Sequence, residues 1–187
     1  MNPKFEVMAT AIIDDNRLVE AKRAGCWGAC HDDAIDMASA PQGKEITKYL
    51  ARSRTKLTRK GGGESYKSKA DLDQLLGKGF FLEYWQARLN RGAAPVAVDG
   101  YILDKRHEYE QRSISAAGGL ENGKWVVVLS RPLKLGRPGR KDFVPGTVYT
   151  VGFAIHDDHA AHRFHQISLG YTLVLDQGKA DFVAAKR

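Results

Sequence analysis

The alternation of apolar and polar residues along the chain predicts a mainly β protein. Short apolar runs rich in Val, Ile, Tyr, Phe and Trp, bounded by Gly, Pro, Asn or Asp, are typical of strands. Such runs occupy residues 5–13, 80–85, 96–103, 124–133, 148–155 and 167–175. Because these short runs are joined by long irregular connections, the pattern favours a β-sandwich with a few short helices over a parallel α/β sheet.

Helical spacing is confined to short stretches in the first half of the chain. Residues 16–24 place charged and apolar side chains at near-helical intervals before Gly25, and 44–51 and 70–76 predict further short helices. The run Gly61-Gly62-Gly63 predicts an exposed loop. It is not a phosphate-binding loop, because no strand precedes it and no Gly-Lys-Ser/Thr sequence follows.

The length and composition are those of a globular domain. The 187 residues are 43% hydrophobic and 27% charged, and no internal repeat is evident. We therefore expect one domain over residues 1–176 and a poorly anchored C-terminal tail over residues 177–187. No run of 18 apolar residues occurs, so we expect no membrane span in this chain.

The chain carries a formal charge of +7, and much of the excess lies in residues 52–60 and 131–141. A basic surface can steer an acidic protein, a nucleic acid or an anionic lipid, whereas the simpler interpretation is a solvated basic loop. We expect a protein partner and no nucleic acid.

The two cysteines stand together in the sequence Cys26-Trp27-Gly28-Ala29-Cys30-His31. Two thiols followed at once by histidine are the attachment signature of c-type haem, in which the thiols become thioethers. The histidine beside the second cysteine is tethered beneath the macrocycle. The motif therefore predicts one haem c attached through Cys26 and Cys30, with His31 as an iron ligand. Its spacer has three residues, a rarer variant of the usual two.

Three other interpretations of this motif stay open. A disulfide between Cys26 and Cys30 would close a very small loop and stabilise little. A zinc site could use Cys26, Cys30 and His31, but structural zinc usually takes ligands from two separated pairs. A redox dithiol normally has two intervening residues at a helix N-terminus.

Four further histidines, His156, His159, His162 and His165, recur at every third position. Neither a helix nor a strand brings four residues at this spacing to one point. We expect one of them to bind iron and the others to face solvent or contact haem propionates, with the isolated His107 at the surface. The residues alone leave several candidates for a second iron ligand: His159, His162, His165, Met8 and Met37.

Several segments of the chain resemble one haem-binding domain family, that of the γ subunits of ethylbenzene dehydrogenase and dimethyl-sulfide-type molybdenum enzymes. The sequence Thr150-Val-Gly-Phe-Ala-Ile-His-Asp-Asp-His-Ala-Ala-His-Arg-Phe-His-Gln-Ile-Ser168, followed by Tyr171-Thr-Leu, is similar to its C-terminal part. The segments Phe81-Leu-Glu-Tyr-Trp-Gln-Ala-Arg88 and Gly123-Lys-Trp-Val-Val-Val-Leu-Ser-Arg-Pro132 resemble two of its strands. The resemblance runs from about Phe5 to Leu175 and is moderately specific.

The resemblance implies a β-sandwich with haem held at one edge. The γ subunits bind haem b through a Met and a Lys. Here the Met-bearing stretch corresponds to the Cys26–His31 segment, and the Lys-bearing stretch corresponds to His165. The comparison thus implies iron ligation by His31 and His165, with His162 as the fallback. Trp27, Phe164, Trp85 and Tyr84 are candidate pocket walls, although each is equally well explained as an ordinary core aromatic.

With both axial positions filled, the iron offers no place for a substrate, and no acid–base constellation is evident. We therefore expect an electron relay rather than an enzyme. The resemblance implies that its partner is a redox protein, such as a quinol-oxidising multihaem cytochrome or a molybdenum oxidoreductase. The alternatives are a haem-based sensor with a displaceable ligand and a zinc- or metal-binding domain that uses the histidine cluster.

Covalent haem attachment normally takes place outside the bacterial cytoplasm, so we expect a periplasmic protein. The N-terminal residues Met1 to Glu6 contain no apolar signal region. The export signal or anchor is therefore expected to lie outside this chain.

Overall fold

The computed structural model describes residues 5–15, 56–58, 64–66, 68–103, 106–157, 165–168 and 170–185. For residues 56–58 and 64–66, Asp157 and His165 it gives the backbone alone. The elements are β1 (Val7–Asp14), β2 (Lys56–Thr58), β3 (Glu64–Tyr66), α1 (Lys69–Gly77), β4 (Leu82–Leu89), β5 (Val96–Ile102), β6 (Arg106–Glu108), β7 (Ser115–Glu121), β8 (Lys124–Ser130), β9 (Val148–Asp157), β10 (His165–Ile167), β11 (Tyr171–Leu175) and β12 (Phe182–Ala184).

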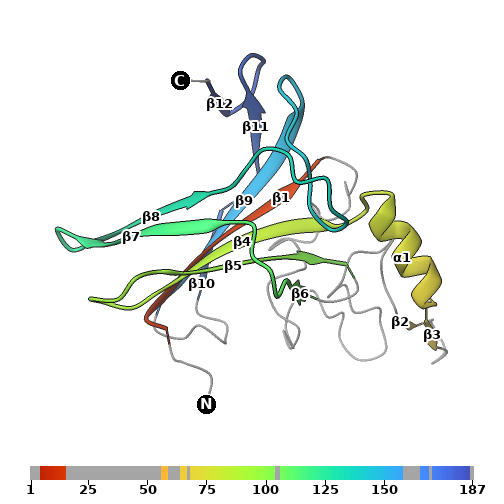
Figure 1. Ribbon diagram of the computed structural model, residues 1–187, viewed down its shortest axis with the longest axis horizontal. Helices are drawn as coiled ribbons and strands as arrows, with labels where there is room; N and C mark the ends of the chain where they lie inside the picture. Colours follow the sequence, from red (N-terminus) through yellow and green to blue (C-terminus); the bar gives the residue numbers. More distant parts are fainter. Residues whose placement is uncertain are drawn as a thin grey trace.

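One large twisted sheet forms the body of the fold (Figure 1). Its strand order is β12-β11-β9-β1-β4-β5-β6, and β10 also pairs with β9. All neighbours are antiparallel except β11 and β12, which run parallel. The first strand, β1, therefore lies in the middle of the sheet, between β4 and β9.

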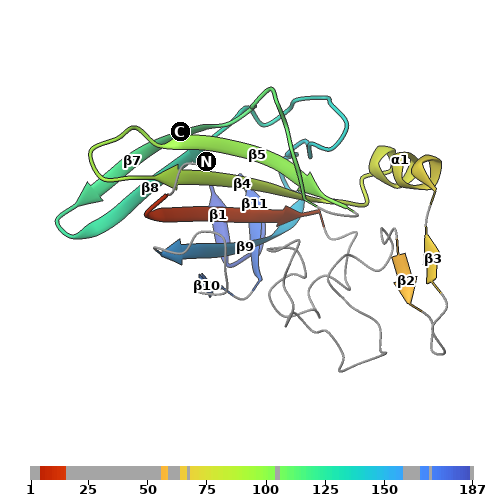
Figure 2. The same cartoon turned by 90° about the horizontal axis from the view of Figure 1, so that it is seen from below.

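The β7–β8 hairpin lies over one face of this sheet and makes a second layer (Figure 2). Trp125, Val127 and Leu129 of β8 pack against Val7 and Leu89 of the large sheet. Because successive residues of a strand point to opposite faces, the intervening Val126 and Val128 of β8 are exposed. The stacked layers confirm the predicted mainly β, sandwich-like fold.

The opposite face of the sheet carries a separate apolar cluster. Ile12, Leu82, Tyr84, Val98 and Ile102 are buried together there, and Phe80 packs against them. The register pairs Ile12 with Tyr84 and Leu82 with Ile102, so these side chains share one face. Both faces of the central strands are thus buried.

The predicted strands agree with β1, β4, β5, β8 and β9, and the helix predicted over 70–76 is α1. The apolar run 167–175 is not one strand, however, because β10 ends at Ile167 and β11 begins at Tyr171. Ile167 faces Ala154 and Tyr171 faces Val151, so one extra residue stands on this side of β9. Such an insertion is a β-bulge.

Five strands were missed by the sequence analysis: β2, β3, β6, β7 and β12. Strand β7 is poor in β-branched residues and forms because the turn at Asn122 and Gly123 directs it onto β8. Both turn residues have positive φ, 49° and 76°, as a tight hairpin turn requires.

The expectation of a poorly anchored tail is wrong for residues 182–184, since β12 pairs with β11. The backbone N–H and hydroxyl of Thr172 both donate to the Asp181 carboxylate, each at 2.7 Å. The domain boundary placed at residue 176 stays a prediction. The helices predicted over 16–24 and 44–51, and the loop Gly61-Gly62-Gly63, lie outside the described residues.

Gly100→Ala is expected to destabilise the sheet. A methyl group there would overlap the carbonyl oxygen of His107 and lie 2.6 Å from the Tyr84 hydroxyl. Overpacking of this kind costs about 1–3 kcal/mol, which urea denaturation should report as a lower free energy of unfolding. Gly119→Ala is the matched control, because Gly119 also lies in a strand and its methyl group would meet no atom within 4 Å. Equal losses in both variants would contradict the packing argument.

Candidate functional site

The histidine predicted as second iron ligand lies beside another histidine in the sheet. His165 begins β10, and its register partner on β9 is His156. On the other side of β9, His156 pairs with Met8 of β1. Three of the residues considered as haem contacts or ligands are therefore adjacent along the hydrogen-bonding direction of the sheet.

His156 is buried, with 4% of its surface exposed. It lines a cavity of about 20 Å³ together with Thr10, Gln86, Arg106 and Ala154. We expected each histidine that does not bind iron either to face solvent or to contact a propionate. His156 does not face solvent. The alternation in β9 explains its burial, because Ala154 and His156 point inward while Phe153 and Ile155 are exposed.

Met8, named as a candidate ligand, is also buried, with 8% exposed. Tyr84, a candidate pocket wall, lines the same cavity as His156. Burial raises the pKa of the Tyr84 hydroxyl, which therefore stays protonated at neutral pH. Its hydroxyl donates to the carbonyl oxygen of His107 at 3.4 Å.

Trp85 lies on the opposite face of the sheet from Tyr84 and His156. Its ring meets Phe143 edge-on at 5.7 Å between centroids, and the guanidinium of Arg131 lies over it at 5.4 Å. The structure thus separates Trp85 from Tyr84, although the sequence analysis grouped both as pocket walls. His107 is half-buried rather than at the surface, because its ring stacks on Tyr101 at 4.5 Å.

The other predicted site residues lie outside the described part of the chain: Cys26, Trp27, Cys30, His31, Met37, His159, His162 and Phe164. Within the described ranges, no three His, Cys, Asp or Glu residues gather as a metal site would require.

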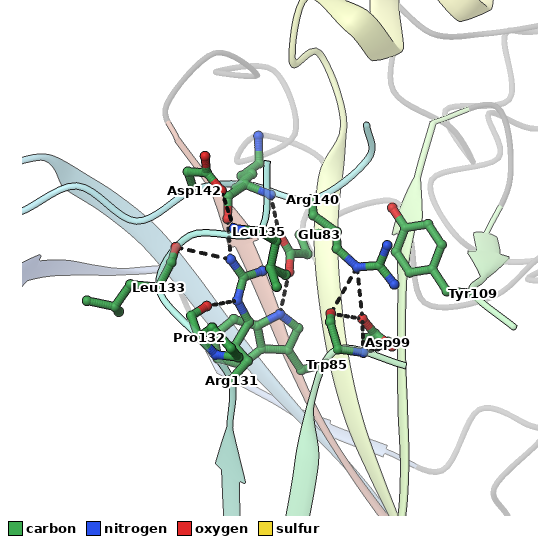
Figure 3. A network of polar contacts seen from close by, with 12 residues as sticks. Glu83, Trp85, Asp99, Tyr109, Arg131, Pro132, Leu133, Leu135, Arg140 and Asp142 are labelled. Atoms are coloured by element: carbon green, nitrogen blue, oxygen red, sulfur yellow. Dashed lines mark hydrogen bonds and ion pairs between the residues drawn. The ribbon is translucent and has the colours of Figure 1, made fainter. Parts of the chain in front are cut away.

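A buried ion pair joins the sheet to the 131–143 loop (Figure 3). The Arg131 guanidinium donates to the Glu83 carboxylate, and the side chains of both residues are nearly inaccessible. The carboxylate also accepts the Trp85 indole N–H at 2.7 Å and the Lys141 backbone N–H at 2.5 Å. Burial raises the pKa of Glu83, while the Arg131 charge and these donors act in the opposite direction.

A second polar cluster ties the same loop to β5. The Arg140 guanidinium donates to the Ser113 hydroxyl at 2.9 Å and lies 3.4 Å from the Asp99 carboxylate. Its flat face covers the Tyr109 ring at 3.7 Å (Figure 3). Further along, Asp142 accepts the backbone N–H groups of Leu135 and Gly136, and these bonds lower the pKa of Asp142.

These contacts change the interpretation of the basic segment 131–141. Arg131, Arg140 and Lys141 all enter ion pairs in which their side chains are at most 6% exposed. Of its cations, Lys134 and Arg137 are exposed. Most of the charge in this segment therefore belongs to the interior of the protein.

Comparison with known proteins identifies the family. The model of the ethylbenzene dehydrogenase family matches residues 5–168. The chain belongs to this family. Among curated proteins, it is 36% identical over 168 residues to a cytochrome c-552 of Stutzerimonas stutzeri, covering 89% of this chain and 48% of that protein. It is 27% identical over 182 residues to a cytochrome c-551 of Rhodocyclus tenuis, covering 97% of this chain and 55% of that protein.

The chain thus spans about half the length of these two relatives. No solved structure matches it. In the described residues, none of the helical structure is long and apolar enough to cross a membrane.

Sequence reasoning missed Gln86, Arg106 and Lys141 as parts of this architecture. Gln86 follows the inward alternation of β4, which the residue pattern already contains. Arg131 and Lys141 are buried because they donate to the Glu83 carboxylate, which lies 48 and 58 residues earlier in the chain. No local sequence pattern reveals contacts this far apart.

Glu83→Gln is expected to destabilise the fold strongly. The substitution keeps the shape of the side chain but leaves the Arg131 charge buried without its carboxylate, which costs about 3–5 kcal/mol. Glu108→Gln breaks the more exposed pair with Arg88 and should cost at most about 1 kcal/mol. Denaturation curves of the two variants should therefore differ clearly. Similar losses would show that Glu83 is not the central partner.

Proposed function

We propose that this chain is a c-type cytochrome module that carries one covalently bound haem and relays electrons between redox proteins. The observation that carries the proposal is the Cys26-Trp27-Gly28-Ala29-Cys30-His31 motif within a chain of the ethylbenzene dehydrogenase family. The two curated relatives, both named as cytochromes c, support the same function.

The residues present suit a haem. Cys26 and Cys30 supply two thiols for thioether bonds, and His31 and His165 supply two imidazoles for the iron. Strand β10 lies beside β9, whose inward residues Ala154 and His156 belong to a buried face of mixed apolar and polar side chains. A cavity of about 20 Å³ has room for one water molecule. The porphyrin would therefore lie against this face rather than inside the cavity.

A bound haem supplies a one-electron iron couple. Cys26 and Cys30 would hold it covalently, and His31 and His165 would supply two imidazole ligands to its iron. Two imidazole ligands favour a lower reduction potential than an imidazole with a thioether. With no open coordination position, the module would pass electrons without transforming a substrate.

We further propose that the partner is a redox protein outside the cytoplasm, either a quinol-oxidising multihaem cytochrome or a molybdenum oxidoreductase. The subunit role of this family in larger oxidoreductases supports a protein partner. Within the 131–141 segment, only the charges on Lys134 and Arg137 face solvent in the described structure. We expect this segment to contribute little electrostatic steering, and salt to weaken its effect further.

The attachment is tested by making the chain with haem-maturation machinery. The wild-type protein should gain the mass of one haem and give a pyridine haemochrome spectrum typical of thioether linkage. Cys26→Ala/Cys30→Ala should lose the covalent haem, because no thiol remains to bond the vinyl groups. Stoichiometric zinc in the wild-type protein, with no haem recovered, would support the metal-binding alternative and overturn the relay.

The second ligand is tested by two neighbouring substitutions. His165→Ala should convert a low-spin spectrum to high-spin and let the reduced haem bind carbon monoxide. His162→Ala, the control in the same segment, should leave the spectrum low-spin. The opposite result would assign the iron to His162. Immediate carbon monoxide binding by the wild-type protein would instead favour the sensor alternative.

A further inference from the structure

The segment that carries the thiols is inserted between two neighbouring strands of the sheet. Strands β1 and β4 are paired, with Ile13 opposite Glu83, yet β1 ends at Asp14 and β4 begins only at Leu82. The chain between them includes the Cys26–His31 motif. Its two ends, at Asp15 and at Gly79–Phe81, therefore meet at one end of the sheet.

The ammonium group of Lys141 contacts both of these ends. Its Nζ lies 3.0 Å from Oδ1 of Asp15 and 3.3 Å from the carbonyl oxygen of Gly79. It also lies 4.3 Å from the centre of the Phe81 ring. Only 3% of the Lys141 side chain is exposed, so these contacts are made largely out of water.

Lys141 is itself held firmly in place. Its backbone N–H donates to the buried Glu83 carboxylate, and its carbonyl oxygen accepts from Arg131 at 2.5 Å. The ammonium thus projects from a fixed part of the structure. Hydrogen bonds that involve a charged group are about twice as strong as neutral ones.

The returning end of the segment follows helix α1. Helix α1 lies beyond the end of the sheet and buries none of its residues (Figure 2). After α1, Phe80 and Phe81 enter the core region. The chain thus passes from α1 to β4 through the short stretch that Lys141 contacts.

We propose that Lys141 is a positioning residue whose ammonium joins the two ends of the thiol-bearing segment and thereby holds the haem in its ligation geometry. The part of this inference that concerns the haem rests on the proposed function. The contacts of Lys141 do not depend on it. A fixed pair of ends reduces the conformations open to the inserted chain. Releasing them would loosen the segment without breaking the sheet.

The test compares Lys141→Met with Lys134→Met in the haem-loaded protein. Both substitutions remove one positive charge from the same loop, but Lys134 is exposed. In Lys141→Met, hydrogen exchange of the backbone amides in residues 68–79 should rise about tenfold, while amides of β4 and β5 change little. Carbon monoxide should bind the reduced haem about tenfold faster, because a haem attached to a looser segment would be held less firmly against its second ligand. Lys134→Met should change neither quantity.

An equal rise in exchange across the whole sheet would mean that Lys141 only stabilises the fold, and would overturn the proposal. Unchanged carbon monoxide binding would overturn its haem-positioning part. If Lys141→Met does not fold, Asp15→Asn removes the opposing charge while Lys141 keeps its contact with Gly79, and the same local rise decides the question. A wild-type chain without haem would overturn the proposed function, whereas the exchange comparison would still test the contacts of Lys141.

Discussion

The buried carboxylate of Glu83 is the constraint on which the surroundings of the sheet depend. A charge removed from water is tolerated only when other groups replace its hydration. The donors come from Trp85 on the same strand and from Arg131 and Lys141 on a distant loop. The 131–143 loop must therefore fold back onto β4. Once it does so, Phe143 packs with Tyr149 and Ile13 in the core.

Because of this arrangement, the charge counted in the sequence of the loop is larger than the charge that the loop exposes at the surface. A run with five cations over eleven residues predicts a basic patch, yet three of these cations form ion pairs with carboxylates inside the protein. Recognition of a partner through this loop would rest on the two that remain outside. The basic stretch is better understood as the means by which an irregular loop is attached to a sheet.

Much of the fold could be predicted because apolar alternation is local. The strands β1, β4, β5, β8 and β9 follow directly from their own residues. Strand β7 could not be recognised from its Ala and Gly residues, since it depends on pairing with β8. The break between β10 and β11 depends on an extra residue opposite β9, which only the register reveals. For the candidate site, the burial of His156 was within reach of the alternation in β9. The contacts of Lys141 were not, because they join residues 62 and 126 positions apart.

The central place of β1 also constrains the order in which the protein assembles. Val7 pairs with Asp157, so the middle of the sheet joins the beginning of the chain to a strand near its end. Pairings this distant in sequence form late, because much chain must be ordered before they bring any gain. The cysteines at positions 26 and 30 precede β9 and are synthesised well before the sheet can close. An enzyme that acted on these thiols could therefore do so while the sheet is still incomplete.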